Sequence, residues 1–189
     1  MSSLPGVAGA GSRRERFQTL YEENYERVLG YALRRVARDD AADVVAETFL
    51  VAWRRLDEVP AGEEARLWLY GTARRVLANQ QRGKRRRERL DERVRSHVVH
   101  EVEPGSADAD LDAAAAAFAR LGPHDRELLA LVAWEGLDAA GIARVCGCSR
   151  NAARIRVHRA RRRFARELER VGRSVKRNAV ARHVSEAYE

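Results

Sequence analysis

The sequence predicts an all-α protein built as two small helical domains that are joined by a flexible acidic linker. Apolar residues recur at three- and four-residue steps through most of the chain, which is the spacing of amphipathic helices. No segment alternates apolar and polar residues as a half-buried strand does. A single acidic stretch without periodicity separates two periodic halves, and this separation indicates two domains.

The first domain is expected to span residues 13–95 and to contain three helices, after a disordered leader of small residues at 1–12. Periodicity runs from about residue 13 to about residue 38, where the first helix should end. Asp40 is expected to cap the second helix. The third begins near Glu64 and becomes strongly basic toward its end.

The linker is expected at residues 96–112, where Pro and Gly stand among acidic residues and no apolar face can be drawn. The second domain, residues 113–171, shows short helices followed by a long one that begins near Arg150. Residues 172–189 form a weakly patterned tail.

The charge balance favours a polyanionic partner. The chain has 36 Lys and Arg against 28 Asp and Glu, a net charge of +8, and such a field most often serves nucleic-acid binding. The five histidines show no metal-ligand spacing, and no Gly-rich phosphate loop is present, so we expect no catalysis, metal or cofactor. Cys146 and Cys148 are too few for a zinc site and indicate a reducing cytoplasm; no run is long enough to predict membrane insertion.

A helix-turn-helix pattern lies between Leu137 and Arg163. Ala143 is small where helices cross, Gly147 permits the turn, and the Ser149 hydroxyl can cap the next helix. On that helix, an apolar stripe faces the core: Ala153, Val157, Ala160, Phe164 and Leu168. The remaining face is expected to bind DNA through Ser149, Arg150, Asn151, Arg154, Ile155, His158, Arg159 and Arg162.

Three segments resemble the extracytoplasmic-function sigma factors of the sigma-70 family. Residues 135–161, preceded by Asp-Arg-Glu-Leu-Leu at 125–129, look like the sigma-four domain. Residues 43–56 resemble the helix with which the family binds polymerase, and residues 68–82 resemble its promoter-melting helix. The resemblance implies a sigma-two-like bundle and a sigma-four-like helix-turn-helix domain, with the latter reading the minus-35 element.

The resemblance also implies partners and further site residues. The partners are promoter DNA, bacterial core RNA polymerase through its β′ coiled coil and β flap, and an anti-sigma factor. The polymerase-binding residues would be Asp43, Val44, Glu47, Leu50, Trp53, Arg54 and Leu56. The minus-10 strand would follow Gly62, Glu63, Arg66, Arg74, Arg75, Asn79, Arg82, Lys84 and Arg85.

A second interpretation stays open on the residues alone. Repressors and response regulators also carry a helix-turn-helix, so the chain is alternatively an ordinary regulator that binds duplex DNA without polymerase. The two interpretations differ in what the free protein does. A regulator binds its duplex unaided, whereas a sigma factor needs core polymerase.

Overall fold

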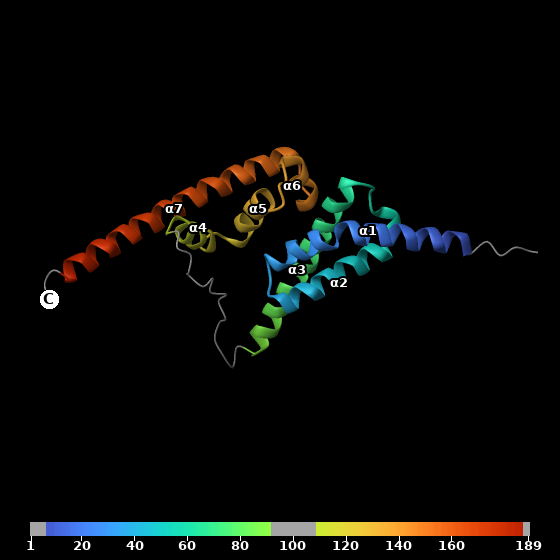
Figure 1. The fold of residues 1–189 in the computed structure, drawn as a ribbon, viewed down its shortest axis with the longest axis horizontal. Helices are drawn as coiled ribbons and strands as arrows, with labels where there is room; N and C mark the ends of the chain where they lie inside the picture. Colours follow the sequence, from blue (N-terminus) through green and yellow to red (C-terminus); the bar gives the residue numbers. More distant parts are fainter. Residues whose placement is uncertain (1–6, 92–108, 187–189) are drawn as a thin grey trace, which may run out of the picture. The chain divides into compact units, whose positions relative to one another are not determined.

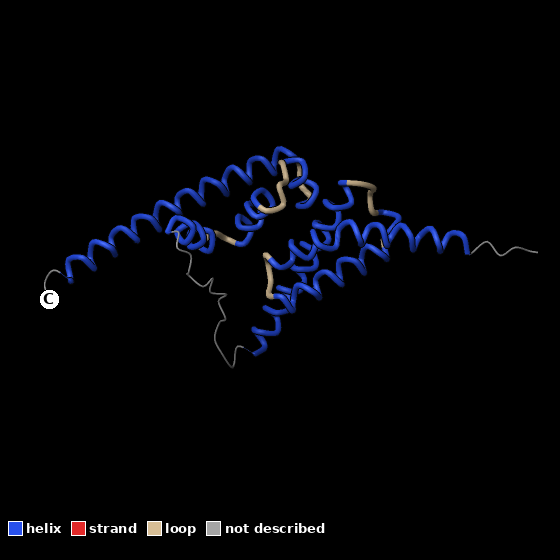
Figure 2. Tube along the Cα trace, viewed as in Figure 1, coloured by secondary structure: helices blue, strands red, loops and turns tan. Residues whose placement is uncertain are grey.

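The computed structural model describes residues 7–91 and 109–186, including the side chains of residues 12–83 and 110–173. Every regular element in these ranges is a helix, which confirms the predicted all-α class (Figure 2). The chain divides into two compact units near residue 96. Figure 1 labels the α-helices, which are α1 (Val7–Leu33), α2 (Arg38–Arg54), α3 (Glu63–Asp91), α4 (Ala109–Ala119), α5 (Pro123–Ala133), α6 (Ala139–Cys146) and α7 (Arg150–Glu186). A short 3-10 helix, η1 (Leu56–Glu58), lies between α2 and α3 in the chain.

The first unit is a three-helix bundle in which α1, α2 and α3 each pack against the other two (Figure 1). Its centre holds Val28, Val44 and Leu69, none of which exposes any surface. Tyr31 of α1 stacks on Tyr70 of α3 with 4.9 Å between ring centroids and 17° between planes. Because Tyr31 is also completely buried, this aromatic pair joins two helices at the middle of the core.

Polar side chains within the first core have partners on their own helices. The Thr48 hydroxyl donates to the Val44 carbonyl at 2.7 Å, and the Thr72 hydroxyl donates to the Trp68 carbonyl at 3.0 Å. The Asn24 amide donates to the carbonyl one turn earlier, at 2.9 Å. These bonds offset the cost of burying the polar atoms without linking one helix to another.

The second unit is built on α7, against which α4 and α5 pack. Leu131 of α5 is completely buried, and so are Ala117 of α4 and Ala160 of α7. Across this core, the guanidinium of Arg163 donates to both carboxylate oxygens of Asp125, at 2.8 and 2.6 Å. Both bonds come from the same guanidinium nitrogen, and Asp125 is only 8% exposed, so this charged pair fixes the start of α5 against α7.

The ends of the first helices differ from the expectation. Residues 7–12, predicted as part of a disordered leader, continue α1 although they include two glycines, because a helix that has already formed extends without a new nucleation cost; residues 1–6 lie outside the described part. Asp40 is not the cap of α2, since the helix already begins at Arg38 and its N-cap Ala37 makes no side-chain bond. Asp39 and Asp40 instead lie within the first turn, where acidic residues favour the helix dipole.

The second half also departs from the pattern in three places. Residues 109–112, expected in the linker, form the first turn of α4, and the rest of the linker lies outside the described residues. The tail is helical through Glu186 as part of α7. Leu168, expected on the apolar stripe, is 37% exposed, while Val171 is 5% exposed. At 100° per residue, Leu168 points to one side of the line through Ala160 and Val171.

Candidate nucleic-acid interface

The helix-turn-helix begins with a side-chain cap on α6. The Asp138 carboxylate accepts hydrogen bonds from the backbone amides of Ala140 and Gly141, at 3.1 and 2.8 Å. These are two of the amides that have no partner inside the helix. Asp138 therefore fixes where α6 starts, a role that the sequence analysis did not assign to it.

The turn between α6 and α7 closes through backbone hydrogen bonds around Gly147. The amide of Cys148 donates to the Ala143 carbonyl at 2.9 Å, and the amide of Gly147 donates to the Arg144 carbonyl at 3.3 Å. Gly147 has a φ of +63°, in the left-handed region that favours glycine. The Ser149 hydroxyl then accepts from the Ala152 amide at 3.2 Å, which confirms the predicted turn and cap.

Gly147→Ala is expected to destabilise the second unit by about 1–2 kcal/mol, because a side chain disfavours the left-handed backbone. Gly172→Ala is the matched control, since Gly172 lies inside α7 with open space around it. That change should stabilise by up to about 1 kcal/mol. Chemical denaturation measures the change in the free energy of unfolding of each variant. Equal changes in the two variants would contradict the assignment of the turn.

Ser149 and the first four turns of α7 bring the eight predicted DNA-binding residues onto exposed surface. Ala153, Val157 and Ala160 of the same helix are buried against the core. Ile155 is an apolar member of the exposed face at 41% exposure. The Arg154 guanidinium donates to the Asn151 side-chain oxygen at 3.3 Å, so two of the eight also contact each other.

Arg163 of this basic helix is paired with an acid on another helix. Arg163 is paired with Asp125 across the core, although the two lie 38 positions apart. Its charge is therefore compensated within the protein, whereas Arg159 and Arg162 are exposed on the face described above. The pair was not predicted, because nothing in the local pattern of α7 indicates an acid on α5.

In the first unit, the predicted strand-path residues fall into two groups. Gly62, Glu63 and Arg66 lie at the start of α3, where Gly62 has a φ of +61°. Glu63 lies between two cations, because its carboxylate is 2.7 Å from the Arg66 guanidinium and 3.5 Å from that of Arg27. The charge of Arg66 is thus partly offset, which lowers its availability to a phosphate.

The second group lies further along α3. Arg75, Asn79 and Arg82 are exposed and separated by four and three residues, so they share one face of the helix. Arg82 donates to the Asn79 side-chain oxygen, and Arg75 donates to the hydroxyl of Thr72 at 3.3 Å. Arg74 is half-buried on the adjacent flank. Lys84 and Arg85 belong to α3, and their side chains lie outside the described set.

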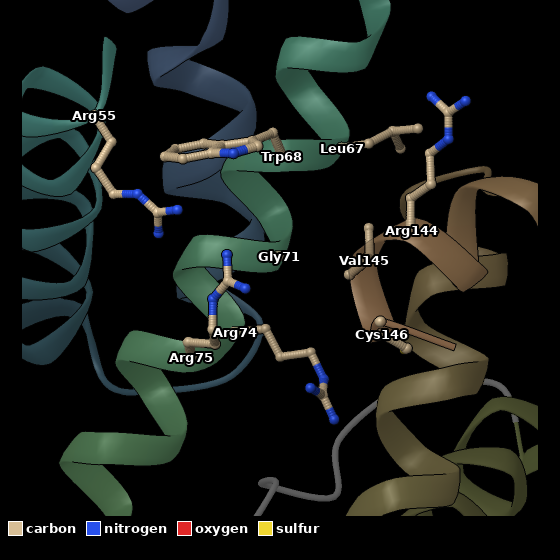
Figure 3. Close-up of a pocket in the computed structure, with 10 residues that line it drawn as sticks. Arg55, Leu67, Trp68, Gly71, Arg74, Arg75, Arg144, Val145 and Cys146 are labelled. Carbon is tan, nitrogen blue, oxygen red and sulfur yellow. The ribbon is translucent and has the colours of Figure 1, made fainter. Parts of the chain in front are cut away.

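Trp68 precedes this face on α3. Figure 3 shows Arg55 extending beside the Trp68 ring, with Arg74 and Arg75 further along the helix. The Arg55 guanidinium lies 5.9 Å from the ring centroid, a cation–π distance. Arg55 also pairs with Glu58, and the hydrogen bond lowers the pKa of Glu58 below its ordinary value. The pair is exposed, and it is lost as the pH falls through that lowered pKa.

Two arginines of α1 hold the segment that leads into α3. Arg13 donates to the Trp53 carbonyl at 2.8 Å, at the end of α2, and Arg16 donates to the Val59 carbonyl at 2.7 Å. Arg13 also contacts the Asp57 carboxylate at 3.1 Å. The clamp was not predicted, since its acceptors lie 40 to 44 positions away and two of the three are backbone carbonyls.

Four of the predicted polymerase-binding residues form one exposed stripe on α2. Asp43, Glu47, Leu50 and Arg54 follow each other at steps of four, three and four residues, and all four are exposed. Leu50 is 46% exposed, although it is a large apolar residue. A single exposed apolar residue is ordinary on a protein surface, so the stripe is a candidate surface because it brings four of the predicted residues together.

The other three predicted polymerase-binding residues are placed differently. Val44 and Leu56 are 0% and 1% exposed, so their assignment to a partner surface is wrong; both face inward and fill the core of the first unit. Trp53 is 37% exposed and packs edge-on against Phe17 at 5.1 Å between centroids. It borders the stripe and also belongs to the packing of α1 on α2.

Two further findings on the described residues concern a metal site and a membrane-spanning helix. No cluster of three or more His, Cys, Asp or Glu side chains in the described ranges has the proximity needed to hold a metal ion. Among the same residues, no helix combines the length and apolar character required to cross a membrane.

Comparisons with known proteins agree on one family. The model of sigma-70 region 2 matches residues 20–87, and the model of sigma-70 region 4 matches residues 111–164. The ECF RNA polymerase sigma factor SigC of Mycobacterium tuberculosis is 33% identical over 160 residues, covering 84% of this chain and 85% of that protein. SigL of the same species is 29% identical over 176 residues, covering 91% and 98% of the two chains.

A solved structure extends the likeness to the fold. The sigma factor RpoE of Bartonella quintana, crystallised with the anti-sigma factor NepR, is 26% identical with a TM-score of 0.62. The match covers 81% of this chain and 96% of that one. With both sigma-70 regions present in order and 33% identity to SigC across most of both proteins, the chain belongs to the extracytoplasmic-function RNA polymerase sigma factors.

Proposed function

We propose that the two units divide promoter recognition between them. The unit of residues 113–171 reads the minus-35 element as duplex, and the unit of residues 13–95 binds core polymerase and opens the minus-10 element. The observation that carries this division is the exposed face of α7, where seven of the predicted side chains follow the cap that the eighth, Ser149, provides. A helix presented in this way fits the major groove.

Within the upstream interface, Arg154 and Arg159 are the arginines proposed to contact base edges or the phosphates beside them. A guanidinium offers paired donors that match the O6 and N7 acceptors of guanine. Ile155 lies between them on the exposed face and offers an apolar contact for a thymine methyl group. Arg150 and Arg162 bind phosphates at the two ends of the face.

Within the downstream interface, the loop at Gly62 and Glu63 shapes the site for an unpaired base, and α3 guides the strand. Arg75, Asn79 and Arg82 supply its exposed polar face, and Arg74, Lys84 and Arg85 add charge along the same helix. Such contacts are largely independent of sequence. The specificity of this interface therefore depends more on the loop than on the helix.

The stripe Asp43, Glu47, Leu50 and Arg54 is proposed as the polymerase-binding surface. Its partner is the β′ coiled coil of the core enzyme, and the second unit meets the β flap. The relative RpoE was crystallised with an anti-sigma factor, which supports a partner of the same kind for this chain. The protein then acts in the cytoplasm, with no cofactor and no catalysis of its own.

A reconstituted transcription assay tests the proposal. Purified protein with core polymerase is expected to initiate at a promoter mapped by sequencing transcript starts after its induction. The free protein should bind the same duplex poorly. Tight, specific duplex binding without polymerase, together with no transcription in its presence, would support the ordinary-regulator alternative instead.

Replacing Arg159 with Ala should weaken recognition of the upstream element by about 1–3 kcal/mol. Arg173→Ala is the matched control, since Arg173 is exposed on the same helix but lies about four turns beyond Arg159 and outside the proposed DNA face. Binding of holoenzyme to promoters with single changes in the upstream element measures the effect. If Arg159→Ala and Arg173→Ala weaken all sequences equally, the proposed orientation of α7 is wrong.

A further inference from the structure

A small cavity in the second unit lies outside the interfaces discussed so far. It has a volume of about 150 Å³ and lies between the turn from α4 to α5 and the middle of α7. Its lining is dominated by charged side chains, namely Arg120, Asp125, Arg163, Arg166, Glu167 and Arg170. Every lining residue belongs to the second unit, so the cavity is part of one compact body.

The charges around the cavity do not balance. Both acids are already paired, because Asp125 binds Arg163 at 2.6 Å and Glu167 binds Arg170 at 2.9 Å. Arg120 and Arg166 are exposed and form no hydrogen bond or ion pair with any other described side chain. Two guanidinium groups without a countercharge therefore border the same small space.

The size and chemistry of the cavity select a class of ligand. Sites for whole small molecules usually occupy about 300–1,000 Å³, so this space suits one functional group of a larger ligand. Arginine forks match the oxygens of phosphate in two-pronged geometry and keep their charge at all physiological pH values. We propose that this cavity binds a phosphate group between Arg120 and Arg166.

The phosphate has two possible sources with the same chemistry. Arg166 follows Arg159 and Arg162 along one face of α7, at steps of three and four residues, so the cavity begins where the proposed DNA face ends. The backbone of the promoter duplex is one source, and the inference for this source rests on the proposed function. A free phosphorylated molecule is the other source, and the inference for it is independent of the proposed function.

The first arm of the test uses inorganic phosphate and the full chain. Phosphate is titrated at constant ionic strength while the arginine side-chain NMR signals are followed. Saturable shifts of the Arg120 and Arg166 signals are expected. The variant with both Arg120→Gln and Arg166→Gln should bind phosphate at least about tenfold more weakly. The control, Arg14→Gln with Arg38→Gln, removes two exposed arginines of the first unit and should bind as the unchanged protein does.

The second arm uses holoenzyme on promoter duplex. If the ligand is a backbone phosphate, the variant with both Arg120→Gln and Arg166→Gln should make the fall of log affinity with log salt concentration less steep by about one. A conservative variant, Arg120→Lys with Arg166→Lys, retains the positive charge but removes the guanidinium groups. It therefore shows whether binding needs the paired hydrogen-bond donors of arginine or only its charge. Thermal melting confirms that each variant is folded.

The outcomes are distinct. Loss of phosphate binding with a changed salt slope supports the DNA source, and loss of phosphate binding alone supports a free phosphorylated ligand. A changed slope without phosphate binding by the free chain also supports the backbone source. If the double variant and the control behave alike in both arms, the cavity is not a phosphate site, whatever the result for Arg159→Ala.

Discussion

Tyr31→Ala is expected to lower the free energy of unfolding of the first unit by about 3–5 kcal/mol, as for other buried aromatic residues. The side chain is completely buried, and its ring stacks on Tyr70 at 4.9 Å. The substitution removes that stack and leaves a cavity between α1 and α3. Since α3 carries the proposed strand path and α2 the proposed polymerase stripe, initiation should be lost as well.

The two units allow a specific measurement of this effect. Hydrogen–deuterium exchange should accelerate across α2 and α3 in the Tyr31→Ala variant, while α5 and α7 remain protected. Leu33→Ala is the control, because Leu33 lies on the same helix and is 40% exposed; its effect should stay within about 0.5 kcal/mol. Equal acceleration in both units would show that they unfold together, contrary to this expectation.

Leu131→Ala should lower the free energy of unfolding of the second unit by about 2–5 kcal/mol. Leu131 has no exposed surface and lies on α5, which packs against α7. Without this contact, the face of α7 loses the support that orients it. Discrimination between upstream elements should fall, while binding of the protein to core polymerase through the proposed α2 stripe should persist.

A competition assay between promoters that differ only in the upstream element measures this loss, and a pull-down with core polymerase measures the retained binding. Leu111→Ala serves as the control, since Leu111 lies in the same unit and is 58% exposed. Unchanged promoter selection by a Leu131→Ala protein of reduced stability would mean that α7 keeps its orientation without α5.

Much of the fold could be predicted because its signals are local. The three- and four-residue periodicity located the helices, and the spacing of Gly147 and Ser149 located the turn and the cap that the structure contains. The eight residues predicted on α7 are exposed together because a single stripe of alanine and valine determines which side is buried. Their roles in binding remain predictions.

The errors arose where the pattern had more than one solution. The helix α2 has apolar residues around much of its circumference, so the sequence did not show that Val44 faces the core while Leu50 faces outward. Contacts between distant segments were also invisible. The pairing of Arg163 with Asp125 and the clamp formed by Arg13 and Arg16 join residues 38 to 44 positions apart.

The clamp has a consequence for how promoter preference can diversify. Arg13 and Arg16 hold the end of α2 and the start of the loop through the carbonyl oxygens of Trp53 and Val59. A carbonyl acceptor is the same in every amino acid, so these two bonds do not depend on which side chains the loop carries. Substitutions at positions 60 and 61 can therefore alter the chemistry that the loop offers to the proposed unpaired base while the path of the backbone is retained. Position 62 stays restricted by the positive φ of its glycine, so the evolution of specificity is separated from the maintenance of the fold at the first two positions of the loop.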